Sequence, residues 1–121
     1  MLIDAATSCL LVIDIQAKLN PVMFDPTRAP KGAAKLLMGA DILDVPTVVT
    51  EQYPKGVGPT VDDLLDFMPA DSPMVKNTFS CVADDAFLTR FKTMDKKQAV
   101  IAGIEAHICV LQTSLQLLGE G

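Results

Sequence analysis

The chain has 121 residues, of which 50% are hydrophobic and 21% are charged. This composition is typical of one globular domain and excludes a disordered chain. The net charge of −5 argues against a surface for nucleic acid or anionic lipid, because both partners require clustered Lys and Arg. No apolar run reaches about 18 residues, so we expect no membrane-spanning helix. Residues 1–4 show neither a secretory signal nor a transit peptide.

Three cysteines and one histidine limit the chemistry that we expect of the chain. An odd number of cysteines without a Cys-x-x-Cys pair is typical of free thiols in a reducing compartment, and we expect a cytoplasmic protein. A single histidine excludes a metal site with several histidine ligands. It also makes a histidine-based catalytic triad a poor hypothesis.

Short apolar runs alternate along the chain with segments of helical periodicity. Residues 9–13 form an unbroken apolar run, which predicts a strand buried on both faces, as in a parallel sheet. In chain order, the pattern predicts strand 9–13, loop 20–30, helix 31–43, strand 47–50, loop 53–59, helix 61–67 with Thr60 as its N-cap, strand 74–75, helix 84–91, strand 98–102 and helix 106–118. This alternation predicts a single α/β domain over residues 1–121, with a mostly parallel sheet between helices on both faces.

Asp14 directly follows the first predicted strand. Open parallel sheets bind their ligands beyond the C-terminal ends of the strands, so polar residues at those ends are candidates for a functional site. A carboxylate in this position is partly desolvated, which suits it to act as a base. The alternatives are a cap for the following segment or an ion pair with a surface lysine.

Lys76 and Cys109 occupy two further ends of predicted elements. Lys76 ends the third strand, where its charge stabilises a neighbouring carboxylate or thiolate; the alternative is an exposed lysine. Cys109 lies in the first turn of the last helix, whose N–H groups and dipole favour a thiolate and can hold an oxyanion. The alternative is an inert buried cysteine, which is the interpretation that we favour for Cys9 and Cys81.

His107 lies two residues before Cys109 on the same predicted helix. Residues with this spacing do not face each other on a helix, so we do not assign His107 as the base for the thiol. We expect a partly exposed, structural histidine.

Three motifs at the ends of successive strands resemble the isochorismatase-like cysteine hydrolases. They are Leu-Leu-Val-Ile-Asp-Ile-Gln at 10–16, Lys-Asn-Thr-Phe-Ser at 76–80 and Gly-Ile-Glu-Ala-His-Ile-Cys-Val at 103–110. The segment Thr-Glu-Gln-Tyr-Pro-Lys-Gly at 50–56 is similar to the branch named isochorismatase domain-containing proteins. The resemblance covers residues 9–121, and three motifs in order are more specific than any one of them.

The resemblance implies a role for each residue at the strand ends. Cys109 is the nucleophile that forms an acyl-enzyme, and Asp14 is the general base. Lys76 holds both in place, and its charge lowers the pKa of the thiol. The backbone N–H groups of Glu105 and Cys109 form the oxyanion hole, and the peptide bond between Ile104 and Glu105 is cis.

The resemblance also bears on the substrate. Gln16, Tyr53 and Phe79 are expected to line the substrate pocket. Family nicotinamidases carry an Asp-x-His-x-x-His metal site where this chain reads Glu-Gln-Tyr-Pro-Lys at 51–55, so we expect no catalytic metal, no cofactor and a substrate other than nicotinamide. True isochorismatases tend to lack the cysteine, and its presence favours hydrolysis of a small amide or a related acyl compound.

The expected partners are a small-molecule substrate and further copies of the chain, because the resemblance implies a homo-oligomer. The alternative function is a catalytically idle member of the fold that serves as an oligomeric scaffold. Some members of the branch carry a ribonuclease or a mitochondrion-associated label, which makes mitochondrial association the alternative location. An acidic chain with one tyrosine does not favour RNA binding. A thiol redox sensor is a third option, and it requires a second cysteine close to Cys109.

The chain ends in Leu-Leu-Gly-Glu-Gly at 117–121, where a related chain continues into a fifth strand. We expect the natural protein to be longer by two strand–helix units of about 30 residues each. The fourth strand is expected beside the first, which leaves its apolar outer edge open to association.

Overall fold

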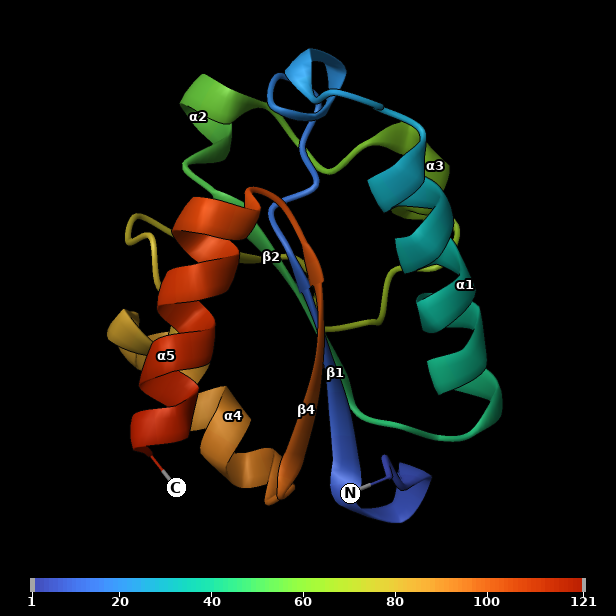
Figure 1. Ribbon diagram of the computed structural model, residues 1–121, viewed down its shortest axis with the longest axis vertical. Coiled ribbons are helices and arrows are strands. Elements are labelled where there is room, and N and C mark those ends of the chain that lie inside the picture. Colours follow the sequence, from blue (N-terminus) through green and yellow to red (C-terminus); the bar gives the residue numbers. More distant parts are fainter. Residues whose placement is uncertain (1, 121) are drawn as a thin grey trace.

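Four parallel strands form the centre of the molecule, in the order β3-β2-β1-β4 (Figure 1). The computed structural model describes residues 2–120. Its strands are β1 (Ser8–Ile13), β2 (Thr47–Gln52), β3 (Met74–Lys76) and β4 (Gln98–Gly103). Its α-helices are α1 (Arg28–Ile42), α2 (Pro54–Val57), α3 (Asp62–Leu65), α4 (Asp85–Met94) and α5 (Leu111–Gly119), and a π-helical turn over Ala106–Val110 leads into α5. The predicted α/β fold with a parallel sheet is confirmed.

Helices cover both faces of the sheet, and β1 is buried along its whole length between them (Figure 1). Side chains alternate between the two faces of an extended strand. Cys9, Leu11 and Ile13 accordingly pack in the apolar layer beneath α4 and α5, while Leu10 and Val12 pack beneath α1 and α3. An unbroken apolar run is therefore what a central strand of this sheet requires.

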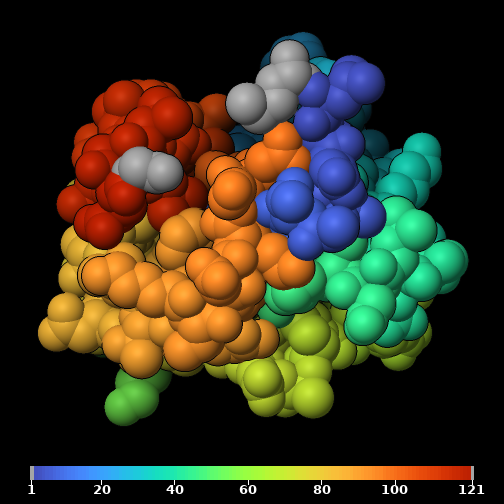
Figure 2. Space-filling view, turned by 90° about the horizontal axis from the view of Figure 1, so that it is seen from below, coloured from blue at the N-terminus to red at the C-terminus, as the bar shows by residue number. Residues whose placement is uncertain are grey.

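β4 pairs with β1, as the sequence predicts, and forms one edge of the described sheet. The N-terminal segment lies against the start of β4, at the end of the molecule seen in Figure 2. There the Gln98 side-chain oxygen accepts hydrogen bonds from the Asp4 backbone N–H and the Ser8 hydroxyl, both at 3.0 Å. The C-terminal ends of all four strands consequently meet at the opposite end. None of the helices between residues 2 and 120 is long and apolar enough to cross a membrane.

Two predicted helices are longer in the structure. α1 begins at Arg28, so the predicted loop 20–30 is too long. Pro30 is the third residue of α1, and in the first turn of a helix the backbone N–H has no partner within the helix. α4 continues to Met94 and ends where Asp95 adopts a left-handed conformation. The Asp84 side chain caps α4 by accepting a hydrogen bond from a backbone N–H of its first turn.

The prediction that Thr60 caps a helix over 61–67 is wrong. α3 is a single turn, Asp62–Leu65, preceded by Val61. The backbone N–H and the hydroxyl of Thr60 both donate to Glu51 Oε2, each at 2.7 Å. The buried carboxylate of Glu51 needs these donors, and it takes the threonine that would otherwise cap the helix.

Gly103 ends β4 at a point of very close approach to β1. Its φ of +148° lies in the region that favours glycine. A Cβ at this position would overlap the carbonyl oxygen of Ile13 and lie 2.8 Å from the Ile13 Cβ. These atoms belong to the central strand and have no room to shift, so only glycine fits at this crossing.

We expect Gly103→Ala to lower the free energy of unfolding by about 3 kcal/mol, because the added methyl group forces β4 away from β1. Urea denaturation followed by circular dichroism measures the change. Gly32→Ala is the matched control, because a Cβ added to this residue of α1 would meet no other atom within 4 Å. The control should gain about 0.5–1 kcal/mol through helix propensity. Equal stability of the two variants would contradict the close approach at Gly103.

Candidate active site

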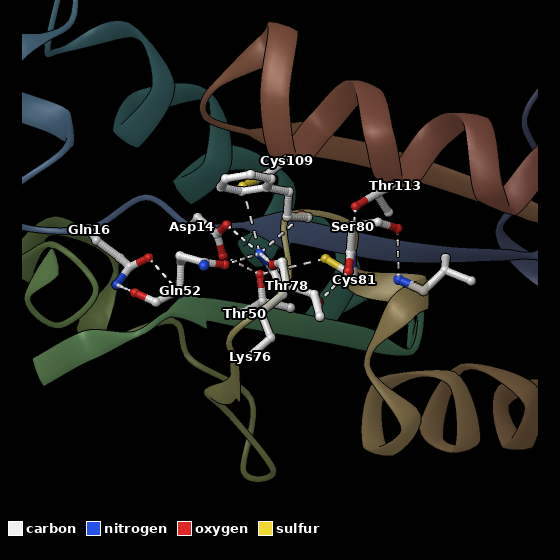
Figure 3. A network of polar contacts seen from close by, with 12 residues as sticks. Asp14, Gln16, Thr50, Gln52, Lys76, Thr78, Ser80, Cys81, Cys109 and Thr113 are labelled. Carbon is white, nitrogen blue, oxygen red and sulfur yellow. Dashed lines mark hydrogen bonds and ion pairs between the residues drawn. The ribbon is translucent and has the colours of Figure 1, made fainter. Parts of the chain in front are cut away.

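Asp14, Lys76 and Cys109 meet at the C-terminal end of the sheet (Figure 3). Asp14 follows β1, Lys76 is the last residue of β3, and Cys109 lies in the π-helical turn after β4. Lys76 Nζ is 2.8 Å from Asp14 Oδ2 and 3.7 Å from Cys109 Sγ. The Asp14 carboxylate is also close enough to the Cys109 thiol to raise its pKa. The structure thus gathers all three predicted residues, with Asp14 and Cys109 both in contact with the Lys76 ammonium.

Asp14 is fully buried, and each of its carboxylate oxygens has a partner. Oδ1 accepts a hydrogen bond from the Thr50 hydroxyl at 2.8 Å, and Oδ2 faces Lys76. The backbone of Asp14 has a φ of +55°, which Asp tolerates better than most residues and which interrupts the strand alternation after Ile13. The ion pair with a surface lysine, considered from the sequence, is excluded because Lys76 is itself buried.

Lys76 is a buried cation that organises its surroundings. Its ammonium donates to Asp14 Oδ2, to Gln52 Oε1 at 2.7 Å, and to the carbonyl oxygens of Thr78 at 2.8 Å and Phe79 at 3.1 Å. Only 2% of the Lys76 side chain is exposed, so the alternative of an exposed lysine does not hold. A charge that is removed from water in this way depends on its partners for compensation.

The surroundings of the Cys109 thiol raise its pKa and so favour the protonated form. Burial raises the pKa of this thiol to about 12, and the nearby Asp14 carboxylate adds to the increase. Lys76 acts in the opposite direction but does not compensate. Lys76 thus acts to lower the thiol pKa, as the resemblance implies, but the net pKa is raised, contrary to the expectation that the site favours a thiolate. The geometry suits activation by a general base at the moment of attack.

Cys9 and Cys81 are buried in the apolar layer beneath α4 and α5. Burial is the main reason that the pKa of each thiol is raised. The Cys81 backbone N–H donates to the buried Thr113 hydroxyl at 2.9 Å, which ties the segment after β3 to α5. Both cysteines fit the inert structural role predicted for them.

The turn before Cys109 contains Glu105 and His107. The His107 side chain is 73% exposed, and its Nε2 lies 4.0 Å from Glu105 Oε2. It is therefore a surface residue, as predicted, and not a partner of the thiol. The peptide bond between Ile104 and Glu105 is cis, as the family resemblance implies. The oxyanion hole at the backbone of Glu105 and Cys109 stays a prediction.

A cavity of about 270 Å³ opens onto Cys109. Its wall is mostly apolar and is formed by Leu19, Gln52, Tyr53, Val57, Phe79, Glu105, Ile108 and Cys109. The predicted pocket residues Tyr53 and Phe79 lie in this wall. Gln16 does not: it is fully buried, and its side-chain amide is occupied by the backbone of Gln52 and by the Gly58 carbonyl.

Thr50 and Gln52 complete the polar network but were not assigned a role from the sequence. Both lie on β2 and are two positions apart, so their side chains share one face of the strand. Thr50 holds Asp14, and Gln52 holds Lys76. Their position at the C-terminal end of β2 is the signal that could have identified them. Among the described residues, no group of three or more His, Cys, Asp or Glu could hold a metal ion.

We expect Asp14→Asn to lower the pKa of the Cys109 thiol, because it removes a negative charge while the Lys76 cation remains. The larger thiolate fraction should increase the rate of alkylation by iodoacetamide at pH 8 by about tenfold or more. Peptide mass spectrometry measures the rate at each cysteine, and Cys9, whose pKa is not influenced by Asp14, serves as the internal control. A slower reaction of Cys109 in the variant would contradict this electrostatic account.

We expect Lys76→Met to lower the free energy of unfolding at pH 7 by about 3–5 kcal/mol, because the Asp14 carboxylate is left buried without its cation. The double variant Lys76→Met/Asp14→Asn should recover part of this loss, because no uncompensated charge remains. Urea denaturation of both single variants and the double variant completes the cycle. Additive losses would show that the ion pair is not coupled.

Residues 8–121 match the family model described as the isochorismatase domain. Isochorismatase domain-containing protein 2 of Danio rerio is 38% identical over 114 residues, covering 94% of this chain and 57% of that protein. Isochorismatase domain-containing protein 1 of Danio rerio is 34% identical over 119 residues, covering 98% of this chain and 42% of that protein. The chain therefore spans about half the length of the curated relatives that it matches.

Solved structures show the same fold. The MAR1 ribonuclease of Caenorhabditis elegans has a TM-score of 0.88 and 36% identity, covering 98% of this chain and 61% of that chain. YcaC of Escherichia coli, described as an octameric hydrolase of unknown specificity, has a TM-score of 0.85 and 26% identity, covering 98% and 60%. YcaC of Pseudomonas aeruginosa, solved with hexane-2,5-diol and covalent acrylamide, has a TM-score of 0.83 and 27% identity, covering 98% and 61%. The family match and the shared architecture together show that the chain belongs to the isochorismatase family and has its hydrolase fold.

Proposed function

We propose that the protein is a metal-independent cysteine hydrolase that cleaves a small amide or a related acyl compound through an acyl-enzyme on Cys109. The observation that carries this proposal is the position of Lys76 Nζ, which contacts both the Asp14 carboxylate and the Cys109 sulfur. A nucleophile, a base that accepts its proton and a cation that holds the two together are the components that such a reaction needs.

In the first half of the reaction, Asp14 takes the thiol proton as Cys109 Sγ attacks the carbonyl carbon. The backbone N–H groups of Glu105 and Cys109 stabilise the resulting oxyanion. The tetrahedral intermediate collapses when Asp14 returns the proton to the leaving nitrogen. The C–N bond breaks, the amine departs, and a thioester on Cys109 remains.

In the second half, Asp14 accepts a proton from water as the water oxygen attacks the thioester carbon. The C–S bond breaks, the carboxylic acid leaves, and the proton returns to the sulfur. Lys76 keeps its protons throughout and holds the carboxylate beside the thiol. The raised pKa of the thiol supports this sequence, because a base must remove the proton during attack.

The cavity supports a small, neutral substrate. Its volume of about 270 Å³ lies below the usual range for drug-sized ligands, and its wall is mostly apolar. The Pseudomonas aeruginosa relative was solved with covalent acrylamide, which is a molecule of this size that carries an amide group. The octameric state described for the Escherichia coli relative supports a homo-oligomer, and the three free thiols support a reducing compartment such as the cytoplasm.

A ribonuclease is the second candidate, because the Caenorhabditis elegans relative carries that description. The net charge of −5 and the small apolar cavity favour an amide over RNA. An idle scaffold is the third candidate. All three differ in their dependence on Cys109, so substitution of this residue separates them.

We expect Cys109→Ala to reduce the hydrolysis of any amide substrate by about 10³-fold or more, because the nucleophile is lost. A screen of small amides with detection of the released amine measures turnover, and acid quenching followed by mass spectrometry detects an acyl adduct on Cys109. Cys9→Ala is the matched control, since it removes a buried thiol near the start of β1, away from the ends of the strands where the site lies. RNA cleavage that survives Cys109→Ala would favour the ribonuclease. Absence of both turnover and adduct would favour the scaffold.

A further inference from the structure

Gln52 occupies a distinctive position, because it both contacts the buried cation and lines the cavity. Its side-chain oxygen accepts a hydrogen bond from Lys76 Nζ at 2.7 Å (Figure 3). The residue also forms part of the cavity wall next to Cys109. The proposed reaction assigns roles to Asp14, Lys76 and Cys109 but none to Gln52. The amide nitrogen of Gln52 is therefore available for a further interaction.

The orientation of the Gln52 amide is fixed by chemistry. An ammonium group can only donate hydrogen bonds, so the atom that faces Lys76 Nζ must be the amide oxygen and not the amide nitrogen. The nitrogen then lies on the far side of the amide group and carries two N–H donors. This Nε2 makes no hydrogen bond to the part of the chain that the structure describes, residues 2–120.

The backbone of Gln52 is held as firmly as its side chain. Its N–H donates to Gln16 Oε1 at 2.7 Å, and its carbonyl oxygen accepts from Gln16 Nε2 at 3.0 Å. Gln16 Nε2 also donates to the Gly58 carbonyl at 2.7 Å, and Gln16 is fully buried. A buried amide that clamps both backbone groups of Gln52 fixes the direction in which its side chain leaves the strand. A binding group held in this way loses little conformational entropy when a ligand arrives.

We propose that Gln52 is a specificity-determining residue, whose amide N–H groups bind an oxygen acceptor of the substrate outside the atoms that react. The inference rests on the proposed function and gives it a substrate class: small carbonyl compounds that carry an acceptor oxygen adjacent to the carbon attacked by Cys109. The rest of the wall is mostly apolar, so a donor at this point orients such a molecule. Lys76 fixes the amide oxygen, which leaves the donor end available.

Alkylation of Cys109 tests the proposal without a known substrate. Iodoacetamide and iodomethane both alkylate the thiol at the carbon that carries iodine. Iodoacetamide has a carbonyl oxygen next to this carbon, which can accept a hydrogen bond, and iodomethane has none. The ratio of the two rates at Cys109 therefore measures recognition of the acceptor, while iodomethane alone measures the reactivity of the thiol. Peptide mass spectrometry gives both rates, and Cys81 provides the ratio for a thiol outside the cavity.

Gln52→Glu is the informative variant, because its carboxylate still accepts from Lys76 but has no donor for the ligand. We expect the rate ratio at Cys109 to fall about tenfold in Gln52→Glu and in Gln52→Leu, as for the loss of one hydrogen bond. Any change in thiol pKa caused by the new charge affects both reagents and cancels in the ratio. A ratio that stays at its wild-type value in both variants would overturn the assignment.

The outcome is separable from that of the proposed function. If no amide is hydrolysed but the ratio falls, Gln52 binds ligands at a site that does not catalyse the proposed reaction. If amides are hydrolysed in a Cys109-dependent manner and the ratio does not move, the hydrolase proposal stands and the role of Gln52 is wrong.

Discussion

The ion pair between Asp14 and Lys76 is the interaction on which the rest of the site depends. Both groups are almost completely removed from water, and they are 2.8 Å apart. A buried carboxylate and a buried ammonium are tolerated only with compensating partners, so each recruits further groups. Thr50 satisfies the carboxylate, while Gln52 and two backbone carbonyl groups satisfy the ammonium. The geometry around Cys109 follows from these requirements.

The parallel sheet makes this concentration of polar groups possible. Parallel strands place all of their C-terminal ends at one edge, so residues that are 62 and 33 positions apart in the chain become direct neighbours. Close contact between β4 and β1 at Gly103 sets where the turn that carries Cys109 begins. Polar ties outside the cavity, such as Gln16 with Gln52 and Glu51 with Thr60, keep the strand ends in position.

Much of this arrangement could be predicted from the sequence. The unbroken apolar run before Asp14 indicates a strand buried on both faces, and the alternation of strands and helices indicates a parallel sheet. Asp14, Lys76 and Cys109 then follow from their positions at element ends, and motifs around them carry the family resemblance. These features are local: hydrophobic periodicity and the direction of parallel strands are properties of short segments. The branch resemblance likewise depends on a short segment, 50–56.

What the sequence determined is therefore the order of the elements and the residues that meet at their ends. The tertiary structure alone decided which partner each polar group takes. Thr60 bonds to Glu51 instead of capping a helix, and Gln16 clamps Gln52 instead of lining the cavity. It also decided that the pKa of the Cys109 thiol is raised, because burial and the Asp14 charge outweigh Lys76. Hydrogen-bond choice and desolvation depend on through-space neighbours from distant segments, and no pattern within one segment contains that information.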